Sequence, residues 1–400
     1  MLRYTLFGES HGPVVGVLLE GVPAGLRLDD DFIAAQLLRR QGGGETATAR
    51  READIPEYLS GVFRGHTTGD PLVAVFYNRD TRPGDYEALR NTPRPGHADY
   101  AAWVKSRGFN DYRGGGRHSG RLTAPLVAAG AIAQTLLRER GITVTAHVAA
   151  EDALREKAKA AKAAGDSVGG CVQCTVTGLP AGLGGFGWAE AADSELARQL
   201  FAIPGVKAVG FGAGEAFADM RGSAANDALH MERGRPAYTT NRSGGVSGGI
   251  TTGMPLVCTV TFRPTPSIAK EQPTVDLSAR EDTTLSVTGR HDACIALRAA
   301  PVVEAAAALA IAALLPPEDD LADLRRELDA IDRELVELFA RRMDMAGRIG
   351  AYKRAHGLAV QDPAREKEVL QSRGELLPER RGQVRRLYEL LLALSREEQA

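Results

Sequence analysis

The chain has 400 residues, a formal charge of −2 at pH 7, and 44% hydrophobic residues. Its length predicts two or three domains, and its apolar content is enough to build a core. A charge this close to zero argues against a general nucleic-acid binder, so any positive site must be local. No segment approaches the ~20 apolar residues of a membrane span, and the N-terminus has no apolar signal segment, so we expect a cytoplasmic protein without membrane contact.

The chain begins with a predicted strand over Arg3–Phe7, a glycine-rich turn, and a second strand over Val14–Leu19. The turn formally matches a nucleophile elbow, in which Ser10 would attack a carbonyl. An elbow normally leads from a strand into a helix, whereas a proline follows here. A tight turn that presents His11 to a ligand is therefore the better interpretation, because histidine exchanges protons near neutral pH.

One short string occurs twice. Gly-Val-Pro-Ala-Gly-Leu at residues 21–26 precedes a predicted amphipathic helix over Asp31–Arg40, and Gly-Leu-Pro-Ala-Gly-Leu at 178–183 precedes another near Ser194–Phe201. Such self-similarity indicates an internal duplication. We therefore expect the first domain to consist of two related halves packed together.

Arginine and glycine recur together in two segments. Arg39 and Arg40 precede a glycine run and Arg50, and residues 113–121 combine arginines, a histidine and a serine with consecutive glycines before an apolar helix that ends near Gly141. Arginine binds phosphate and carboxylate bidentately, glycine lets the backbone approach a ligand, and a helix N-terminus is positive. These segments predict an anion site, although the glycine run alone also fits a flexible surface loop.

Two later segments place carboxylates beside histidines. His97 follows a Pro-Gly turn, which favours exposure and chemistry over packing, and Asp99 would either orient it or cap the next helix. Asp292 follows His291 ahead of an alanine-rich helix that runs to Leu315. For Asp292 a helix N-cap and a base are both open interpretations.

Two further motifs match known chemistry only weakly. Cys171 and Cys174 have the spacing of a redox or half-zinc pair, but a strand there would turn them to opposite faces, so we expect no metal. Residues 206–215 resemble a dinucleotide fingerprint, yet Glu215 stands where its last glycine belongs. Neither motif carries a functional prediction.

Taken together, these segments resemble the chorismate synthase family across residues 1–315. The resemblance rests on the motifs at residues 8–13, 21–25, 94–100, 114–121, 263–267 and 290–292. It implies an α+β fold, a β-α-β sandwich with an internal pseudo-repeat, that assembles as a homotetramer. The implied reaction is the 1,4-anti elimination of phosphate from 5-enolpyruvylshikimate 3-phosphate to give chorismate. The cofactor would be reduced FMN (FMNH2), with NADPH as a candidate reductant.

The same resemblance assigns roles to residues of this chain. His11 would assist the leaving phosphate, His97 would protonate the reduced flavin, and Asp292 would help remove the ring proton through flavin N5. The implied cofactor contacts are Arg40, Arg117, His118, Ser119, Ala225, Asn226, Gly248, Arg263, Pro264, Thr265, Pro266, Ser267 and Arg290. The implied substrate contacts are Arg39, Arg50 and Arg121. The chain departs from the family pattern at Thr46, His118, Gly120, Leu122 and Ala293, which flank the site.

The composition changes at residues 316–320, where prolines and acidic residues predict a linker before a helical domain over 321–400. Its first helix carries a heptad-like seam: Leu324, Leu328, Ile331, Leu335, Leu338, Met345, Ile349 and Tyr352. Arg342 interrupts this seam, and a charge there is costly unless it is paired. Lys353 lies about three turns further on the same face, whereas Arg325 is about 25 Å away along the axis and would more easily serve a second site across a dimer.

Asp362 and Pro363 predict the start of a second helix, and Arg380–Glu398 predicts a third. This arrangement resembles the all-helical chorismate mutase family across residues 320–400, which implies an all-α three-helix domain in an intertwined dimer. The implied reaction is the cofactor-free Claisen rearrangement of chorismate to prephenate, with Lys353 and Gln399 stabilising charge on the ether oxygen. The implied substrate contacts are Arg325 from the partner chain, Arg342, Lys353, Asp362, Arg365, Glu366, Ser395 and Gln399.

The hypothesis is therefore a bifunctional enzyme of aromatic amino acid biosynthesis, in which the N-terminal domain makes chorismate and the C-terminal domain converts it to prephenate. The alternative keeps the first activity and makes the tail a non-catalytic assembly arm or a regulatory arm that binds a ligand. Every position of the C-terminal domain that aligns with the site of the chorismate mutase family carries the expected residue, which favours the catalytic hypothesis.

Overall fold

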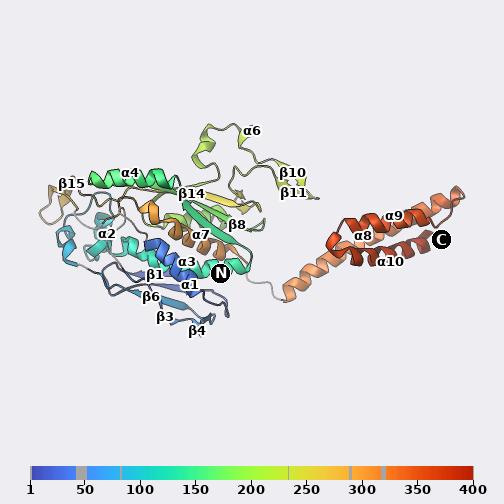
Figure 1. Ribbon diagram of the computed structural model, residues 1–400, viewed down its shortest axis with the longest axis horizontal. Helices are drawn as coiled ribbons and strands as arrows, with labels where there is room; N and C mark the ends of the chain where they lie inside the picture. Colours follow the sequence, from blue (N-terminus) through green and yellow to red (C-terminus); the bar gives the residue numbers. More distant parts are fainter. Residues whose placement is uncertain are drawn as a thin grey trace. The chain divides into compact units, whose positions relative to one another are not determined.

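The computed structural model describes residues 2–41, 52–81, 83–232, 234–287, 291–316 and 321–399. The predicted site residues Arg50 and Arg290, and the departure at Thr46, lie outside this part of the chain. The chain forms two compact units, Met1–Leu315 and Pro316–Ala400, which we call the N-terminal and C-terminal units (Figure 1). Within the described residues, no helix is long and apolar enough to cross a membrane.

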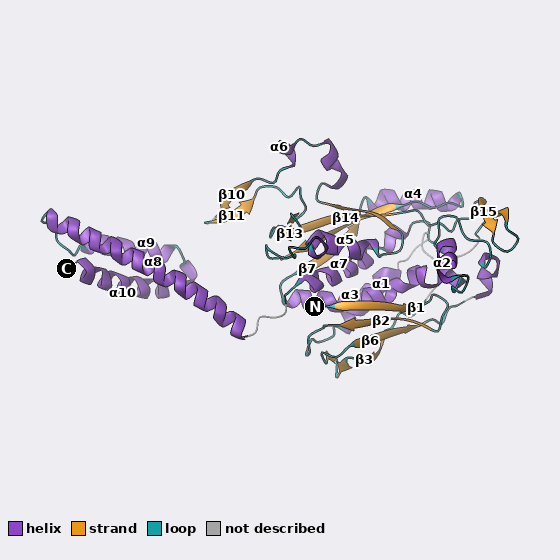
Figure 2. Cartoon of the chain, turned by 180° about the vertical axis from the view of Figure 1, so that it is seen from behind, coloured by secondary structure: helices purple, strands orange, loops and turns teal. Residues whose placement is uncertain are grey.

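The N-terminal unit consists of two four-stranded antiparallel sheets with a layer of helices between them (Figure 2). The first sheet contains β1 (Arg3–Gly8), β2 (Val14–Glu20), β6 (Leu72–Tyr77) and β3 (Glu57–Ser60), in that spatial order. The second contains β7 (Thr143–Val148), β8 (Gly170–Thr177), β14 (Leu256–Phe262) and β9 (Val206–Phe211). The central helices are α1 (Asp30–Gln41), α3 (Thr123–Glu139), α5 (Ala192–Phe201) and α7 (Ala300–Leu314).

The topology confirms the predicted internal repeat. When the inserted elements, such as α4 and the arm between β9 and β14, are left out, the chain order is strand, strand, helix, strand, strand, helix in each half: β1, β2, α1, β3, β6, α3, and then β7, β8, α5, β9, β14, α7. In both sheets the four strands lie in the order first, second, fourth, third. Two halves with the same connections and the same strand order fit a duplicated unit.

The two Pro-Ala-Gly-Leu strings occupy equivalent places and are held by equivalent threonines. The Thr67 hydroxyl donates to the Pro23 carbonyl at 2.6 Å, and the Thr251 hydroxyl donates to the Pro180 carbonyl at 2.7 Å. In both copies the threonine hydroxyl also accepts a hydrogen bond from the N–H of the leucine in the string. The threonine carbonyl accepts one from the N–H of the glycine just before that leucine. The repeat therefore extends to individual hydrogen bonds.

The core lies in the helical layer, where α3 and α7 pack together. Nearly every side chain of α7 is buried, which fits its alanine-rich sequence and its central place. A Cβ built on Gly130 of α3 would lie 2.2 Å from Cβ of Ala305 on α7, so the two helices approach closely only because one residue lacks a side chain. The two sheets cover the helical layer from either side. Along β14, every second residue is buried against it.

Additional helices and strands lie outside the two sheets and the central helical layer. They are α2 (Asp99–Ser106), α4 (Glu151–Ala163), α6 (Gly222–Ala225), β4 (Val62–Phe63), β5 (His66–Thr67), β10 (Leu229–Glu232), β11 (Arg235–Tyr238), β12 (Val246–Ser247), β13 (Ile250–Thr251), β15 (Gln272–Asp276) and β16 (Glu281–Leu285). Figure 1 shows α6, β10 and β11 on an extended arm that leaves the second sheet. Because β9 belongs to an antiparallel sheet and leads into this arm, the dinucleotide-like motif does not form a β-α-β unit.

The C-terminal unit contains α8 (Leu321–Ala355), α9 (Pro363–Glu375) and α10 (Arg381–Gln399). Helix α10 packs against both of the others. The seam of α8 remains open within one chain, with exposed fractions from 44% at Ile349 to 60% at Tyr352. The three predicted helices therefore form. The apolar stripe of α8, which we expect to pack against a partner, is exposed in a single chain.

Candidate functional site

The glycine run lies between the two histidines that the sequence singled out. In the turn of residues 113–118, Gly114, Gly115 and Gly116 have positive φ of 59°, 82° and 52°. A Cβ on Gly114 would lie 2.3 Å from Nδ1 of His11, and one on Gly115 would lie 2.9 Å from Cε1 of His97. Any side chain here would collide with a histidine ring. The run is a partly buried cradle, so the flexible surface loop interpretation is wrong.

His97 is held by a carboxylate and an arginine. Nδ1 of His97 is 2.5 Å from Oδ1 of Asp99, and Nε of Arg94 donates to Oδ2 of Asp99 at 2.7 Å. Burial would raise the pKa of Asp99, but the hydrogen bonds from His97 and Arg94 hold it well below its usual range. Asp99 therefore orients His97 and does not cap the next helix, whose N-cap position belongs to Ala98.

His11 occupies the turn between β1 and β2, with its ring edge against Tyr86 at 4.8 Å between centroids. Two antiparallel strands flank this turn, and no helix follows it. The nucleophile-elbow interpretation of Ser10 is therefore wrong, since an elbow requires the strand to turn into a helix.

The Arg263–Ser267 segment contacts the turn of residues 94–97, which carries His97. Nη1 of Arg263 donates to the Gly96 carbonyl at 2.5 Å, and Nη1 of Arg94 donates to Oγ of Ser267 at 3.1 Å. The hydroxyl of Thr265 is buried and has no hydrogen-bond partner among the described residues. A buried hydroxyl without a partner, in a segment that contacts Arg94, indicates a suitable place for a polar ligand.

A second cluster joins two of the predicted arginines through a carboxylate that the sequence did not reveal. Arg40 and Arg121 both donate to Asp54, whose side chain has 0% of its surface exposed. Burial opposes ionisation of Asp54, yet the charges of the two arginines lower its pKa. Nε of Arg40 and Nη2 of Arg121 are buried without an acceptor in the described part of the chain. These unused donors fit the binding of an anion.

Asp292 lies beside this arginine cluster. Nη2 of Arg298 donates to Oδ2 of Asp292 at 2.5 Å. The turn that carries Arg298 contacts α1, the helix that carries Arg40. Burial lowers the pKa of Arg40, the charge of Asp54 opposes this, and the positive charge of Arg298 adds to the lowering. The N-cap interpretation of Asp292 is wrong, because Cys294 and Ala299 hold the N-cap positions of the helical segments that follow.

Two predicted arginine contacts lie outside these clusters. Arg39 binds both carboxylate oxygens of the buried Glu304 on α7, at 2.6 and 3.0 Å. Arg117 is exposed, and its Nη1 donates to the Leu6 carbonyl at 3.0 Å. These contacts do not join either guanidinium group to His11 or His97. Their assignments to substrate and cofactor remain predictions.

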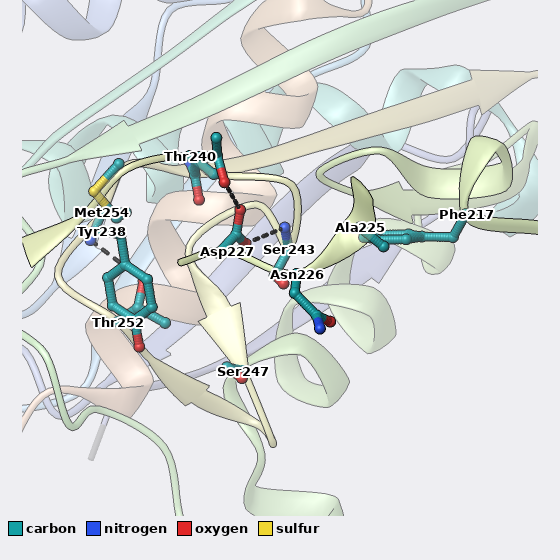
Figure 3. Close-up of a pocket in the computed structure, with 11 residues that line it drawn as sticks. Phe217, Ala225, Asn226, Asp227, Tyr238, Thr240, Ser243, Ser247, Thr252 and Met254 are labelled. Carbon is teal, nitrogen blue, oxygen red and sulfur yellow. Dashed lines mark hydrogen bonds between the residues drawn. The ribbon is translucent and has the colours of Figure 1, made fainter. Parts of the chain in front are cut away.

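Ala225 and Asn226 belong to a separate pocket of about 310 Å³ in the arm, with Gly248 next in sequence to its lining residue Ser247 (Figure 3). The pocket wall is organised by Asp227, which accepts from the Thr240 hydroxyl at 2.6 Å and from the N–H groups of residues 242 and 243. Burial opposes the ionisation of Asp227, but these hydrogen bonds lower its pKa to about 2. The predicted flavin contacts thus do not gather in one place: Arg40 lies in the Asp54 cluster, and Ala225 and Asn226 line the pocket of the arm.

In the C-terminal unit, predicted site residues from α8 and α10 meet. Nη1 of Arg342 donates to Oγ of Ser395 at 2.5 Å, so the arginine that interrupts the seam is paired. Nζ of Lys353 donates to the Val360 carbonyl at 2.5 Å and lies 3.4 Å from Oε1 of Gln399. A cation and an amide therefore stand together at the end of α10, where charge on an ether oxygen could be stabilised.

The start of α9 adds further groups. Asp362 is the N-cap, as predicted, and accepts from the Arg365 N–H at 3.0 Å. Glu366 is bound through both oxygens by Arg396, at 3.0 and 2.9 Å. Arg325 is exposed and lies seventeen residues before Arg342 on one continuous helix, or about 25 Å along the axis. One chain does not bring Arg325 to the other predicted contacts.

Comparison with known proteins assigns both units. The family model described as chorismate synthase matches residues 2–151 and 149–315, and the model described as chorismate mutase type II matches residues 324–400. A chorismate synthase of Thermococcus gammatolerans is 48% identical over 340 residues, covering 78% of this chain and 95% of the relative. One of Chitinophaga pinensis is 49% identical over 315 residues, covering 78% and 94%. A crystal structure of chorismate synthase has the same fold, with a TM-score of 0.63 at 24% identity, over 83% of this chain and 98% of the other.

Proposed function

Because the chain belongs to the chorismate synthase family and carries a type II chorismate mutase domain, we propose that it makes chorismate from 5-enolpyruvylshikimate 3-phosphate with reduced FMN, and then converts chorismate to prephenate. The chain is a bifunctional enzyme with both domains. The observation that carries the first activity is the glycine cradle between His11 and His97. The observation that carries the second is the pairing of Arg342 with Ser395 and of Lys353 with Gln399.

The elimination removes a ring proton and a phosphate group, so it needs groups that move protons and groups that bind anions. His11 is assigned to the leaving phosphate, to which an imidazolium would donate. His97 is held through Nδ1 by Asp99, and its Nε2, 3.4 Å from Nη2 of Arg94, is assigned to proton exchange with the cofactor. Asp292 is assigned to the ring proton, and Arg40 and Arg121 offer unused donors to the substrate anions.

The residues fit reduced FMN as the cofactor. Residues 263–267, with Ser119 and His118 at the end of the glycine turn, would hold it, and the unpaired Thr265 hydroxyl supports a polar ligand there. When bound, reduced FMN would supply electron density for breaking the carbon–oxygen bond and regain it, since the reaction has no net redox change. NADPH is the proposed reductant of free FMN. Burial lowers the pKa of His118, and the neighbouring His97 and Arg117 lower it further.

In the C-terminal unit, Arg342 would bind a carboxylate of chorismate in its compact conformer. Lys353 and Gln399 would stabilise the charge that develops on the ether oxygen as its bond breaks. Asp362, Arg365, Glu366 and Ser395 would orient the remaining polar groups. Arg325 would reach the site of a second chain across an intertwined dimer, for which the exposed seam of α8 is the support.

The assembly that we propose is a homotetramer. Its support in the N-terminal unit is exposed apolar surface: Leu229 and Met231 alternate on β10 of the arm, and Phe186 and Trp188 are almost wholly exposed in one loop. A cytoplasmic location is supported by the four cysteines, which are all free thiols, as is usual in a reducing compartment.

One experiment tests both activities. The purified chain is incubated anaerobically with chemically reduced FMN and 5-enolpyruvylshikimate 3-phosphate, and phosphate, chorismate and prephenate are followed together. We expect phosphate release and prephenate as the end product. If chorismate accumulates, and added chorismate is not converted, the tail is the non-catalytic arm of the alternative hypothesis. If no phosphate is released, the proposed first activity is wrong.

A further inference from the structure

The two central helices of the repeat begin in the same way. Helix α3 follows a 3-10 turn over Gly120–Leu122, and α7 follows a 3-10 turn over Ile295–Arg298. Arg121 stands two residues before the first residue of α3, and Arg298 stands two residues before the first residue of α7. Since α3 and α7 each close one half of the repeat, Arg298 is the pseudo-symmetric counterpart of Arg121.

Each of these two arginines binds a carboxylate, but the two carboxylates differ. Asp54, the partner of Arg121, also accepts from Arg40 and is fully enclosed. Asp292, the partner of Arg298, keeps 8% of its surface exposed. For the side chains alone, the exposed fraction is 0% for Asp54 and 8% for Asp292, so both carboxylates are buried and only Asp292 keeps a small accessible surface. Asp54 is therefore a structural counter-ion that holds two arginines in place.

We propose that Arg298 is a positioning residue for chorismate formation, which acts by fixing the carboxylate of Asp292 through the bond from Nη2 to Oδ2. The proposal rests on the proposed function, in which Asp292 accepts the ring proton. Arg298 itself transfers no proton and binds no substrate group. It restricts the rotation of the carboxylate, so that the oxygen used for proton transfer has one orientation.

The place of Arg298 in the fold suits this role. Its turn leads directly into the buried helix α7 and contacts α1 and β8, so the backbone that carries the arginine is tied to the core. The hydrogen bond is charge-assisted, and such bonds are short and geometrically selective. A base that is misplaced by about 1 Å can lose about 100-fold in rate, so one orienting bond can control the chemical step.

The test is a double-mutant cycle with Arg298→Gln, Asp292→Asn and the double variant, assayed anaerobically with reduced FMN and 5-enolpyruvylshikimate 3-phosphate. We expect Arg298→Gln to lower kcat about 100-fold while KM changes less than about threefold. The double variant should be no slower than Asp292→Asn, because Arg298 acts only through Asp292. Arg298→Lys, which keeps the charge and one donor, should recover about a tenth or more of the lost rate.

Two measurements without turnover separate positioning from a structural role. Binding of oxidised FMN, followed by flavin fluorescence, should be the same in Arg298→Gln as in the unchanged chain. Thermal unfolding should show that the variant is still folded at the assay temperature, although loss of the buried pair with Asp292 should lower its midpoint. Arg155→Gln is the matched control, since Arg155 also pairs with a carboxylate, Glu151, but on the exposed helix α4. Arg298→Lys provides the kinetic comparison if the glutamine variant unfolds.

Several results would overturn the proposal. They are an unchanged kcat in Arg298→Gln, a rise in KM alone, which would make Arg298 a substrate ligand, and losses that multiply in the double variant. If Asp292→Asn keeps the full rate, the assigned role of Asp292 in the proposed function fails, and the proposal fails with it. If Asp292→Asn is impaired and Arg298→Gln is not, only the role of Arg298 is wrong.

Discussion

Both units place buried or partly buried arginines in their candidate sites, but they build these sites differently. In the N-terminal unit, Arg40 and Arg121 meet Asp54 inside a closed core, and the contacts come from segments far apart in one chain. In the C-terminal unit, three helices bring Arg342 to Ser395 but leave Arg325 apart and the seam of α8 exposed. The larger unit encloses its arginine–carboxylate cluster within one chain, whereas the three-helix unit leaves its apolar seam exposed in one chain, which agrees with the proposed dimer.

The largest expected effect is on the C-terminal site. Replacing Arg342 with alanine should lower kcat/KM for the conversion of chorismate to prephenate by at least about 1,000-fold, because a preorganised charge is lost from the site. Formation of chorismate should not change, since it belongs to the other unit. Prephenate is measured directly from added chorismate, with Arg385→Ala, at an exposed pair with Glu389, as control. Unchanged turnover would exclude a catalytic role for this site.

The second prediction removes the counter-ion of the enclosed cluster. Asp54→Asn should destabilise the N-terminal unit by about 3–5 kcal/mol, because two buried guanidinium groups lose the charge that compensates them. Urea unfolding, followed by the tryptophans, which are both in the N-terminal unit, measures this loss. Asp166→Asn, at the exposed pair with Lys270, is the control and should change stability by less than about 1 kcal/mol. An equal effect in both variants would contradict the enclosed cluster.

A pair of glycine substitutions sharpens the contrast further. Gly130→Ala should cost about 1–3 kcal/mol, because the new methyl group would stand 2.2 Å from Ala305. Gly347→Ala should instead stabilise α8 by up to about 1 kcal/mol, since a Cβ there meets nothing within 4 Å in the single chain. Circular dichroism during thermal unfolding measures both. Loss of stability in Gly347→Ala together with a change in oligomeric state would show that a second chain packs against that residue.

The smallest effect concerns pH. The folded-state pKa of Asp99 is depressed by His97 and Arg94, although burial opposes this. Asp99 therefore contributes stability that is fully present above the ordinary carboxyl pKa of about 4 and is lost as the pH falls through the folded value. The difference in unfolding free energy between the unchanged chain and Asp99→Asn should thus be larger at pH 7 than at pH 3. A difference that does not depend on pH would mean that the ionisation of Asp99 contributes nothing to the free energy of unfolding.

The sequence predicted those features that depend on neighbouring residues. The hairpin that presents His11, the N-cap at Asp362 and the three helices of the tail follow from local turn, capping and periodicity rules. The glycine run was recognised as a ligand cradle, but only the structure shows that it separates His11 from His97. Local rules also left the roles of Asp99 and Asp292 undecided.

The partners that sequence reasoning missed are distant in the chain. Asp54 lies 67 residues from Arg121, and Glu304 lies 265 residues from Arg39. No local pattern marks such an acid, because its position depends on which helices and strands pack together. Arg94 is different, since it stands in the same short motif as His97 and its contact with Asp99 follows from proximity. For Asp54, a search for acidic residues near Arg40, fourteen residues away, would have given a candidate. For Glu304, the sequence offers no such clue.

The matching threonine bonds in the two halves have a historical consequence. A half-length ancestor with one such unit would have associated as a homodimer, and both central helices would then have begun with the same arginine beside a twofold axis. In a homodimer every substitution appears twice, so neither copy can specialise. Within one chain the two halves can differ, and their arginine–carboxylate pairs do: Asp54 is shared by Arg40 and Arg121, whereas Asp292 pairs with Arg298.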